Sequence, residues 1–402
     1  MKIAIITIGH EGSSLPLAKS LAQNGHIVDL YFDLRFGRRQ LVEGTDLQLH
    51  SLRGLVGEVP GPMIQSLKTW IGTAPLTFKY INTVGEAKSK PLLTPFFSYI
   101  RNIQIKHICK CLDFQNYDAI YLIGRYLGTD DIILYAKYLT TKIYVGLHEV
   151  CNHLCPDFYE PSPLLKFLFS RNIPIVVYSH KTYEDLKNYR ECNIANVSLI
   201  HFGIFDTYPI CNVKSTLLLP EKYILFFGYI QPYKGLSILV EAMEMMQNFP
   251  SNWNIVIAGN GKDDSLSRIA NNNRFILLNR FLSNSELVEL LSKSTAVVCP
   301  HISMSQSGIP QTAFAFGVPV ITSDLEGFKE VVVNGENGLL FQNGSPESLC
   351  CCIKKIVNQP KVLDFLKEGA RNFNQLHHDF SWNHIALKYE ELFNEVVSKN
   401  TI

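Results

Sequence analysis

The chain has 402 residues, of which 47% are apolar and 18% are charged, and its formal net charge is +1 at pH 7. A chain of this length is expected to form two or three domains. The composition excludes a disordered, collagen-like or disulfide-stapled protein, and the near-neutral charge argues against a strongly basic nucleic-acid-binding surface.

Short β-branched runs alternate with amphipathic helical runs through the first half of the chain. The N-terminal MKIAIITIGHEGSS superficially resembles a signal peptide, but His10 and Glu11 stand where small residues should lead to cleavage. We therefore expect a first buried strand from Lys2, then a helix over SLPLAKSLAQNG and a strand over HIVDLYF. Further continuously apolar strands, typical of a sheet covered on both faces, are predicted from Asp118, Lys142, Asn172 and Asn196.

A basic region lies between these strands, from Lys68 to Lys110. It holds seven Lys or Arg residues and a single acid, Glu86, around the apolar segment PLLTPFFSYI. Such a region can dock on an anionic membrane surface, where each charge contributes ~1 kcal/mol. A solvated face over an ordinary core helix explains the same composition, and the sequence does not separate these two interpretations.

The second half repeats the alternation more regularly. A strand from Tyr223 precedes a helix, and WNIVIAG, RFILLNR, TAVVCPH and PVITSD follow as strands separated by helical segments. Ser283 with Glu286 three residues later predicts a capping box. Because β-α alternation favours parallel sheets with right-handed crossovers, we expect an α/β chain of two Rossmann-like, doubly wound domains facing across a cleft. Their boundary is expected near Phe205–Leu219.

The ten cysteines follow no pairing pattern, and Cys350, Cys351 and Cys352 are consecutive. Neighbouring residues on a helix point to different sides, so these three thiols cannot build one metal site. We expect reduced thiols and a cytoplasmic protein. No apolar stretch approaches the roughly 20 residues of a spanning helix, so no membrane span is expected.

Ligands of open α/β sheets bind beyond the carboxyl ends of the strands, and two loops there could hold an anion. In FFGYIQPYKG, Gly228 permits a tight turn and Lys234 precedes the next helix, which suits a diphosphate. A solvent-exposed loop lysine is the simpler alternative. The second loop, HISMSQSGIPQTAFAFGVPVI, would form an anion-binding nest from the amides of Ser305, Ser307 and Gly308, before a helix over Ile309–Phe316.

A third loop, GLHEVCNHLC, places His148 and Glu149 at the end of a predicted strand, with His153 and two cysteines close behind. A zinc-protease helix needs HExxH, with histidines four residues apart, whereas these are five apart. We therefore predict no metal site and expect a neutral His148 that either bonds a ligand hydroxyl or is satisfied in the core. The patterns at Gly9–Gly12 and Gly259–Lys262 do not complete GxGxxG, which disfavours a nicotinamide oxidoreductase.

Several segments of the chain occur in the order found in one enzyme family. FFGYIQPYKGLSILVEAM resembles its glycine–arginine…lysine–glycine loop, and IVIAGNG resembles its AGxG strand end. RFILLNRFLSNSELVELLSKSTAVVCPH resembles the strand–helix–strand before the donor loop, and AFAFGVPVITSDLEGFKEVVVNGENGLLF resembles the GxPVI segment with Glu330 and an NGxNG turn. The first strand with LAKSLAQNGHIVDLYF, and the final FSWNHIALKYEELFNEVV, resemble the first βα unit and the C-terminal helix. On these segments the chain resembles a retaining glycosyltransferase of family 4, with the two-domain GT-B fold.

The resemblance implies an acceptor-side domain over 1–205, a nucleotide-sugar-binding domain over 206–375, and a C-terminal helix over 376–402 that packs back on the first domain. The chain also departs from the family pattern. Tyr229 follows the loop glycine in place of arginine, and Met304 and Thr312 stand where the family has two glutamates. The SQSG version of this loop resembles a subgroup from bacterial exopolysaccharide clusters that lacks the glutamate pair.

The implied reaction moves a sugar from a nucleoside diphosphate to a hydroxyl of a glycan or lipid-linked glycan, with retention and without a cofactor or metal. No nucleic acid partner is implied. The protein would work on the cytoplasmic face of a membrane in polysaccharide or glycolipid biosynthesis, and residues 68–110 would contact an anionic membrane surface if they dock there. A catalytically silent binding or scaffold subunit and a nucleotide-sugar epimerase are the alternatives.

The resemblance also assigns roles to individual residues. His148 and Lys234 are the expected catalytic residues, and Asn337 is a weaker candidate near the nucleotide. The expected donor-binding residues are Gly228, Tyr229, Lys234, Gly259, Ser305, Gln306, Ser307, Gly308, Thr312 and Glu330. The expected acceptor-side residues are Gly9, His10, Gly12, Glu149 and His153.

Overall fold

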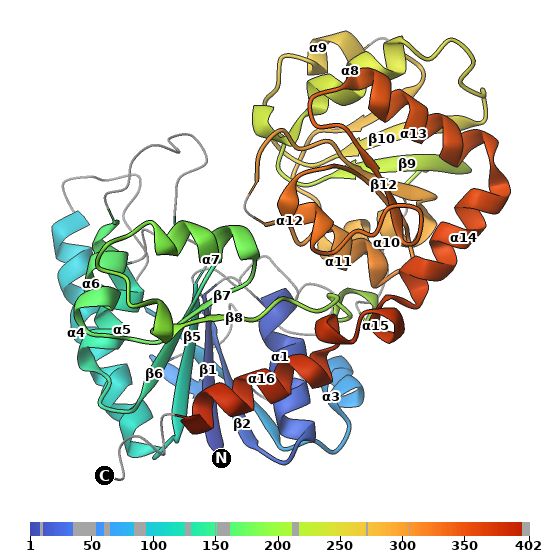
Figure 1. The fold of residues 1–402 in the computed structure, drawn as a ribbon. Coiled ribbons are helices and arrows are strands. Elements are labelled where there is room, and N and C mark those ends of the chain that lie inside the picture. Colours follow the sequence, from blue (N-terminus) through green and yellow to red (C-terminus); the bar gives the residue numbers. More distant parts are fainter. Residues whose placement is uncertain are drawn as a thin grey trace. The chain divides into compact units, whose positions relative to one another are not determined.

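The computed structural model of the chain describes residues 1–8, 11–34, 54–59, 65–83, 94–124, 130–148, 150, 161–210, 217–270, 272–304 and 306–395. The chain divides into two compact units, each built on a parallel-dominated sheet (Figure 1). The first unit comprises Met1–Phe202 together with Trp382–Ile402, and the second comprises Gly203–Ser381. These divisions lie a few residues from those expected after residues 205 and 375.

The sheet of the first unit has the strand order β3-β4-β2-β1-β5-β6-β7-β8. Its central part, from β4 to β7, has the 3-2-1-4-5-6 order of a doubly wound Rossmann sheet, and the edge pair β3–β4 is antiparallel. Consecutive residues of the central strands are buried, because both faces of the sheet are covered. The strands are β1 (Lys2–Ile8), β2 (Ile27–Asp33), β3 (Val56–Glu58), β4 (Leu76–Ile81), β5 (Ala119–Gly124), β6 (Ile143–Leu147), β7 (Ile175–Val177) and β8 (Val197–Leu199).

Helices of the first unit pack on this sheet through apolar faces. Ile105 of α4, Ile132 of α5 and Leu165 of α6 belong to one hydrophobic core with the strands. Two serines cap helices at their N-termini: Ser162 Oγ accepts from Leu165 N at 3.2 Å, and Ser179 Oγ accepts from Thr182 N at 3.2 Å. The helices are α1 (Glu11–Gln23), α3 (Gln65–Ile71), α4 (Thr94–Phe114), α5 (Asp130–Tyr138), α6 (Pro163–Ser170), α7 (His180–Lys187), η4 (Ile194–Asn196) and α16 (Trp382–Glu395).

The C-terminal helix α16 packs in the first unit, beside α1 (Figure 1). The Tyr389 hydroxyl lies 2.9 Å from that of Tyr121, which lies 2.5 Å from that of Tyr178. All three tyrosines are buried, and burial raises the pKa of each hydroxyl. Gly146 on β6 makes room for them, because a Cβ there would lie 1.9 Å from the Tyr178 hydroxyl. This packing confirms the fold prediction that the last helix returns to the first domain.

The second unit has the wholly parallel strand order β11-β10-β9-β12-β13-β14. This is again the 3-2-1-4-5-6 order, so the connections change direction between β9 and β12. Apolar cores lie on both faces of this sheet. The strands are β9 (Lys222–Phe227), β10 (Trp253–Ala258), β11 (Phe275–Leu278), β12 (Ala296–Cys299), β13 (Val320–Ser323) and β14 (Gly338–Phe341).

Helices of the second unit follow its strands in the predicted alternation. Ser283 and Glu286 form the capping box, with Glu286 N donating to Ser283 Oγ at 3.2 Å and Ser283 N donating to the Glu286 carboxylate at 2.9 Å. The helix expected over 309–316 ends earlier, and Gly317 follows it with a φ of +65°. The helices are η5 (Tyr208–Ile210), η6 (Pro232–Lys234), α8 (Leu236–Glu244), α9 (Leu266–Ile269), α10 (Asn284–Lys293), α11 (Ile309–Phe314), α12 (Glu326–Lys329), α13 (Pro346–Asn358), α14 (Pro360–Arg371), α15 (Phe373–Leu376) and η7 (His378–Phe380).

Three consecutive cysteines lie on α13, and they point to different sides as predicted. Cys350 and Cys352 are buried, whereas Cys351 is exposed. Burial raises the pKa of Cys352 to about 11, so this thiol stays protonated near neutral pH. The cysteines within the described residues are all free thiols.

Candidate functional site

The loops after β9 and β10 meet in direct backbone contact at the carboxyl edge of the second sheet. Gly228 N donates to Ala258 O at 3.1 Å, and Ile230 N donates to Asn260 O at 2.9 Å. Gly259 has a φ of +149°, and a Cβ there would lie 1.8 Å from Gly228 O. Gly259 is therefore required for this close approach of the two loops, and the φ of +117° at Gly228 favours glycine there.

Lys234 ends the short helix η6, and its side chain reaches the end of the neighbouring strand β12. Its Nζ lies 2.8 Å from His301 Nε2, although the two residues are 67 positions apart in the chain. His301 is 1% exposed, whereas Lys234 is half-buried. Gly235 follows with a φ of +70°, and a Cβ there would lie 1.7 Å from Pro300 O. The loop after β9 is thus packed tightly on the residues that follow β12.

The loop before α11 reaches the same edge of the sheet. A Cβ on Gly228 would lie 3.9 Å from Ile309 Cδ1, so the first residue of α11 borders the Gly228 turn. Gly308 packs on Phe205, since a Cβ there would lie 2.6 Å from the ring. Ser307 Oγ accepts from Ile309 N at 3.3 Å. Gly228, Gly259, Lys234 and this loop therefore gather around the crossover point of the sheet, and ligand binding by them stays a prediction.

Other predicted donor-binding residues have different surroundings. Tyr229 is 58% exposed, and Glu330 is half-buried at the end of α12. Thr312 is buried, and its hydroxyl donates to Gly308 O at 2.7 Å within α11. The Oε1 atom of Gln306 is buried and has no hydrogen-bond partner among the described residues. Ser305 lies outside them, so the amide nest is described only from Gln306 onward.

Asn337, named as a weaker nucleotide ligand, is fully buried and holds the loop before β14. Its Nδ2 donates to Val331 O at 3.2 Å, and its Oδ1 accepts from Val333 N at 2.9 Å. Both ends of the amide are used by backbone groups of its own turn. This arrangement makes Asn337 a structural residue of the turn.

In the first unit, His148 follows β6 and lies half-buried between aromatic rings. Its ring centroid is 5.1 Å from that of Tyr178 and 4.9 Å from that of Phe202. Two histidines that the sequence analysis did not single out lie nearby, since His201 Nδ1 is 3.1 Å from Tyr178 O and the rings of His180 and His201 are 5.6 Å apart. His201 follows β8, and His180 begins α7 after β7. The positions of these histidines in the chain share no spacing motif.

Of the predicted acceptor-side residues, Gly12 lies in the first turn of α1, just beyond the carboxyl end of β1. Gly9, His10, Glu149 and His153 lie outside the described residues. Within the described residues, no three or more His, Cys, Asp or Glu side chains are grouped so that they could hold a metal ion.

Only some of the basic residues between Lys68 and Lys110 lie on the surface of the structure. Lys79 donates to Asp29 at 2.7 Å, and Arg101 lies 3.3 Å from Asp131, with all four side chains largely buried. Lys106, like Lys68 and Lys110, is exposed. Lys88 and Lys90 lie outside the described residues. Two of the basic residues counted from the sequence therefore belong to buried ion pairs rather than to a surface.

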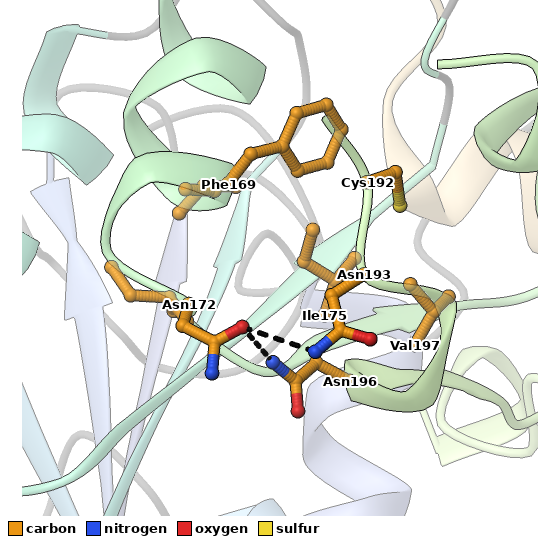
Figure 2. A pocket seen from close by; sticks show the side chains of 9 residues that line it. Phe169, Asn172, Ile175, Cys192, Asn193, Asn196 and Val197 are labelled. Carbon is orange, nitrogen blue, oxygen red and sulfur yellow. Dashed lines mark hydrogen bonds between the residues drawn. The ribbon is translucent and has the colours of Figure 1, made fainter. Parts of the chain in front are cut away.

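The first unit also has a pocket, shown in Figure 2. It lies at the amino-terminal edge of the sheet, opposite to the carboxyl edge where His148 lies. Among the residues that line it, Asn172 Oδ1 accepts hydrogen bonds from Asn193 and Asn196. These residues precede β7 and β8, whereas His148 follows β6. The pocket is thus separate from the predicted site. It is lined by Leu168, Phe169, Asn172, Ile173, Ile175, Cys192, Asn193, Asn196 and Val197.

The chain is similar in sequence and in fold to known glycosyltransferases. Residues 212–373 match a family model described as glycosyl transferases group 1. An uncharacterized glycosyltransferase of Methanocaldococcus jannaschii is 22% identical over 92% of this chain and 90% of its own length. A sucrose-phosphate synthase of Thermosynechococcus elongatus superposes with a TM-score of 0.65 at 17% identity, covering 99% of this chain and 100% of that one. HepE of Anabaena, solved with UDP and glucose, superposes with a TM-score of 0.61 at 14% identity, covering 98% of this chain and 100% of that one.

Proposed function

We propose that this chain, a glycosyltransferase with the GT-B fold, transfers a sugar from a nucleoside diphosphate donor to a hydroxyl of a glycan or glycolipid acceptor. We further propose retention of anomeric configuration, no metal requirement, and membership of family 4 in its SQSG-loop subgroup. Polysaccharide or glycolipid biosynthesis on the cytoplasmic side of a membrane is the proposed setting. The observation that carries the proposal is the position of Lys234 Nζ, 2.8 Å from His301 Nε2, at the crossover point of the second sheet.

The chemistry of the reaction explains why a cation belongs there. As the bond between sugar and diphosphate breaks, negative charge develops on the departing diphosphate. Lys234 supplies a positive charge, and the glycines at 228 and 259 allow a ligand to approach the backbone without side chains intervening. Gln306 Oε1 is buried and has no hydrogen-bond partner in the described part of the chain, so it can accept a hydrogen bond from a donor hydroxyl. A lysine in this role would make a metal ion unnecessary.

His148 is proposed to bind the sugar or to assist at the reaction centre. Its ring is fixed against Tyr178 and Phe202 at the carboxyl edge of the first sheet. The neutral form of histidine can donate from one ring nitrogen and accept at the other, which suits recognition of a hydroxyl. The HepE structure with UDP and glucose supports uridine diphosphate sugars as the first donors to test.

The test compares wild type with Lys234→Ala in donor turnover and in transfer to glycan and glycolipid acceptors. Loss of a charge-assisted hydrogen bond costs about 1.5–3 kcal/mol, so kcat/KM should fall about 10- to 150-fold. Lys222→Ala removes an exposed lysine from the other end of β9 and should leave the rate unchanged. Chelation of divalent ions should leave the rate unchanged, and the product's anomeric configuration should match that of the donor.

Two results would replace this proposal with its alternatives. Nucleotide binding without turnover of any nucleotide sugar would favour a scaffold subunit. A converted nucleotide sugar, formed without acceptor and without free nucleotide, would favour an epimerase.

We also propose that the protein attaches peripherally to anionic membranes through one face of α4. Phe96, Tyr99 and Ile103 are 58%, 66% and 52% exposed. At 3.6 residues per turn, they share about a quarter of the helix circumference with the exposed Lys106 and Lys110. The buried residues of α4 lie on the opposite face. An exposed apolar stripe continued by lysines suits an anionic lipid surface. None of the helices in the described part of the chain combines the length and hydropathy needed to span a bilayer.

A further inference from the structure

The ring of His301 is held on several sides at the end of β12. It meets the Phe328 ring edge-on, with centroids 5.2 Å apart and planes at 89°, and lies 6.3 Å from the Tyr233 ring. Its own backbone oxygen accepts from Ser323 Oγ at 2.7 Å. With 1% of the residue exposed, the ring has little freedom to leave Lys234.

The chemistry of the two side chains determines which one donates the hydrogen bond between Lys234 Nζ and His301 Nε2. An ammonium group carries three donors and no acceptor, so His301 Nε2 must accept from Lys234 Nζ. The imidazole is then neutral and carries its proton on Nδ1. A carboxylate in the same place would also orient the lysine, but it would cancel the charge that an anionic ligand needs.

We infer that His301 is a positioning residue for Lys234: as a buried neutral acceptor it orients the ammonium for a diphosphate and adds no negative charge beside it. This inference rests on the proposed function, and it assigns His301 no contact with the donor. The backbones of the two loops are held together by contacts that do not involve the side chains of His301 and Lys234. Ile302 N donates to Tyr233 O at 2.8 Å, and Gly235 packs against Pro300 O.

Because those backbone contacts do not involve the ring, substitutions of His301 can isolate its bond to Lys234. His301→Leu removes the acceptor, whereas His301→Gln keeps one in its side-chain oxygen. Binding of UDP, ADP and GDP to the full chain is measured by calorimetry, with melting temperatures as the check of folding. We expect His301→Leu to weaken nucleoside diphosphate binding about tenfold and His301→Gln to recover most of the loss. In a Lys234→Ala background, His301→Leu should cause no further loss.

A spectroscopic measurement tests the same pairing without any ligand. In wild type, the ring ¹⁵N resonances of His301 should show a protonated Nδ1 and an unprotonated Nε2. In Lys234→Ala, the ring loses the donor that selects this tautomer, and its resonances should shift toward the other neutral form. A protonated Nε2 in wild type would overturn the inference even if the variants of His301 did not fold.

The binding results separate this inference from the proposed function. If wild type binds none of the three nucleoside diphosphates, the proposed function fails. If wild type binds one and His301→Leu binds it equally well, His301 does not position Lys234. Losses that add in the double variant would also overturn the inference, because they would mean that the two side chains act independently.

Discussion

The exposed stripe on α4 gives a quantitative expectation for membrane binding. Full burial of a large apolar side chain is worth about 1.5–3 kcal/mol. Phe96, Tyr99 and Ile103 are little more than half exposed, at 58%, 66% and 52%, so each can gain only about 1 kcal/mol on entering a lipid interface. Together they would contribute about 3 kcal/mol. Lys106 and Lys110 would add about 2 kcal/mol at low salt.

The perturbation is the triple variant Phe96→Ser, Tyr99→Ser, Ile103→Ser. A loss of about 3 kcal/mol corresponds to a fall of about 150-fold in the partition coefficient. The assay is flotation of the full chain with vesicles of neutral lipid alone or neutral lipid mixed with anionic lipid. Leu387→Ser is a matched control, because Leu387 is 50% exposed on α16 of the same unit. It should leave flotation unchanged.

The charge contribution is tested separately with Lys106→Gln, Lys110→Gln. This variant should float about 30-fold less at low salt, and the difference from wild type should shrink as salt screens the surface. Flotation of wild type that ignores lipid charge would refute the reasoning. So would a triple serine variant that floats like wild type, or a Leu387→Ser control that loses as much as the triple variant.

Three further predictions concern stability. Tyr389→Ala should lower the free energy of chemical unfolding by about 3–5 kcal/mol, because it empties a buried site between α16 and the first sheet. As a control, Leu387→Ala changes an exposed residue of the same helix and should lower it by under about 0.5 kcal/mol. Equal losses would contradict the packing described. Gly259→Ala should abolish nucleotide binding and lower the melting temperature far more than Gly344→Ala, because only the first would place a Cβ 1.8 Å from a backbone oxygen. Equal shifts in melting temperature would argue against the close approach of the loops after β9 and β10. The pKa of Glu286 is lowered from 4.5 to about 2 by hydrogen bonds from an arginine and its capping serine, so its stabilising contribution is present above about pH 4.5 and is lost as pH falls toward 2. The difference in unfolding free energy between wild type and Glu286→Gln should therefore shrink over that range, and a constant difference would contradict it.

Local signals carried most of the fold prediction. Continuous apolar runs predicted most of the parallel strands of both sheets, though not β4 or β14, because strands covered on two faces need apolar side chains throughout. The capping box at Ser283 could be predicted because its two partners are three residues apart. The edge strand β3 could not, since it is three residues long and none of its side chains is buried. Little apolar periodicity is left in such a strand.

Tertiary pairing explains what the sequence could not indicate at the site. The glycine turns and Lys234 were predicted, because their chemistry is visible locally. The partner of Lys234 was not, since His301 stands 67 residues away and nothing in its own loop marks it as an acceptor. Arg101 was counted as surface charge, because its ion pair with Asp131 forms between two helices and leaves no local pattern.

The return of α16 to the first unit has a consequence for how the chain folds while it is being translated. Residues 203–381 form an insertion within the first unit, so the helix α16 leaves the ribosome only after the whole inserted unit has been synthesised. Until then, the pocket that Gly146 leaves for tyrosine hydroxyls lacks Tyr389, and Tyr144 lacks the ring of Phe393, 4.7 Å away in the folded protein. During translation the inserted unit can therefore complete its fold first, while the unit that was synthesised earlier waits for its closing helix.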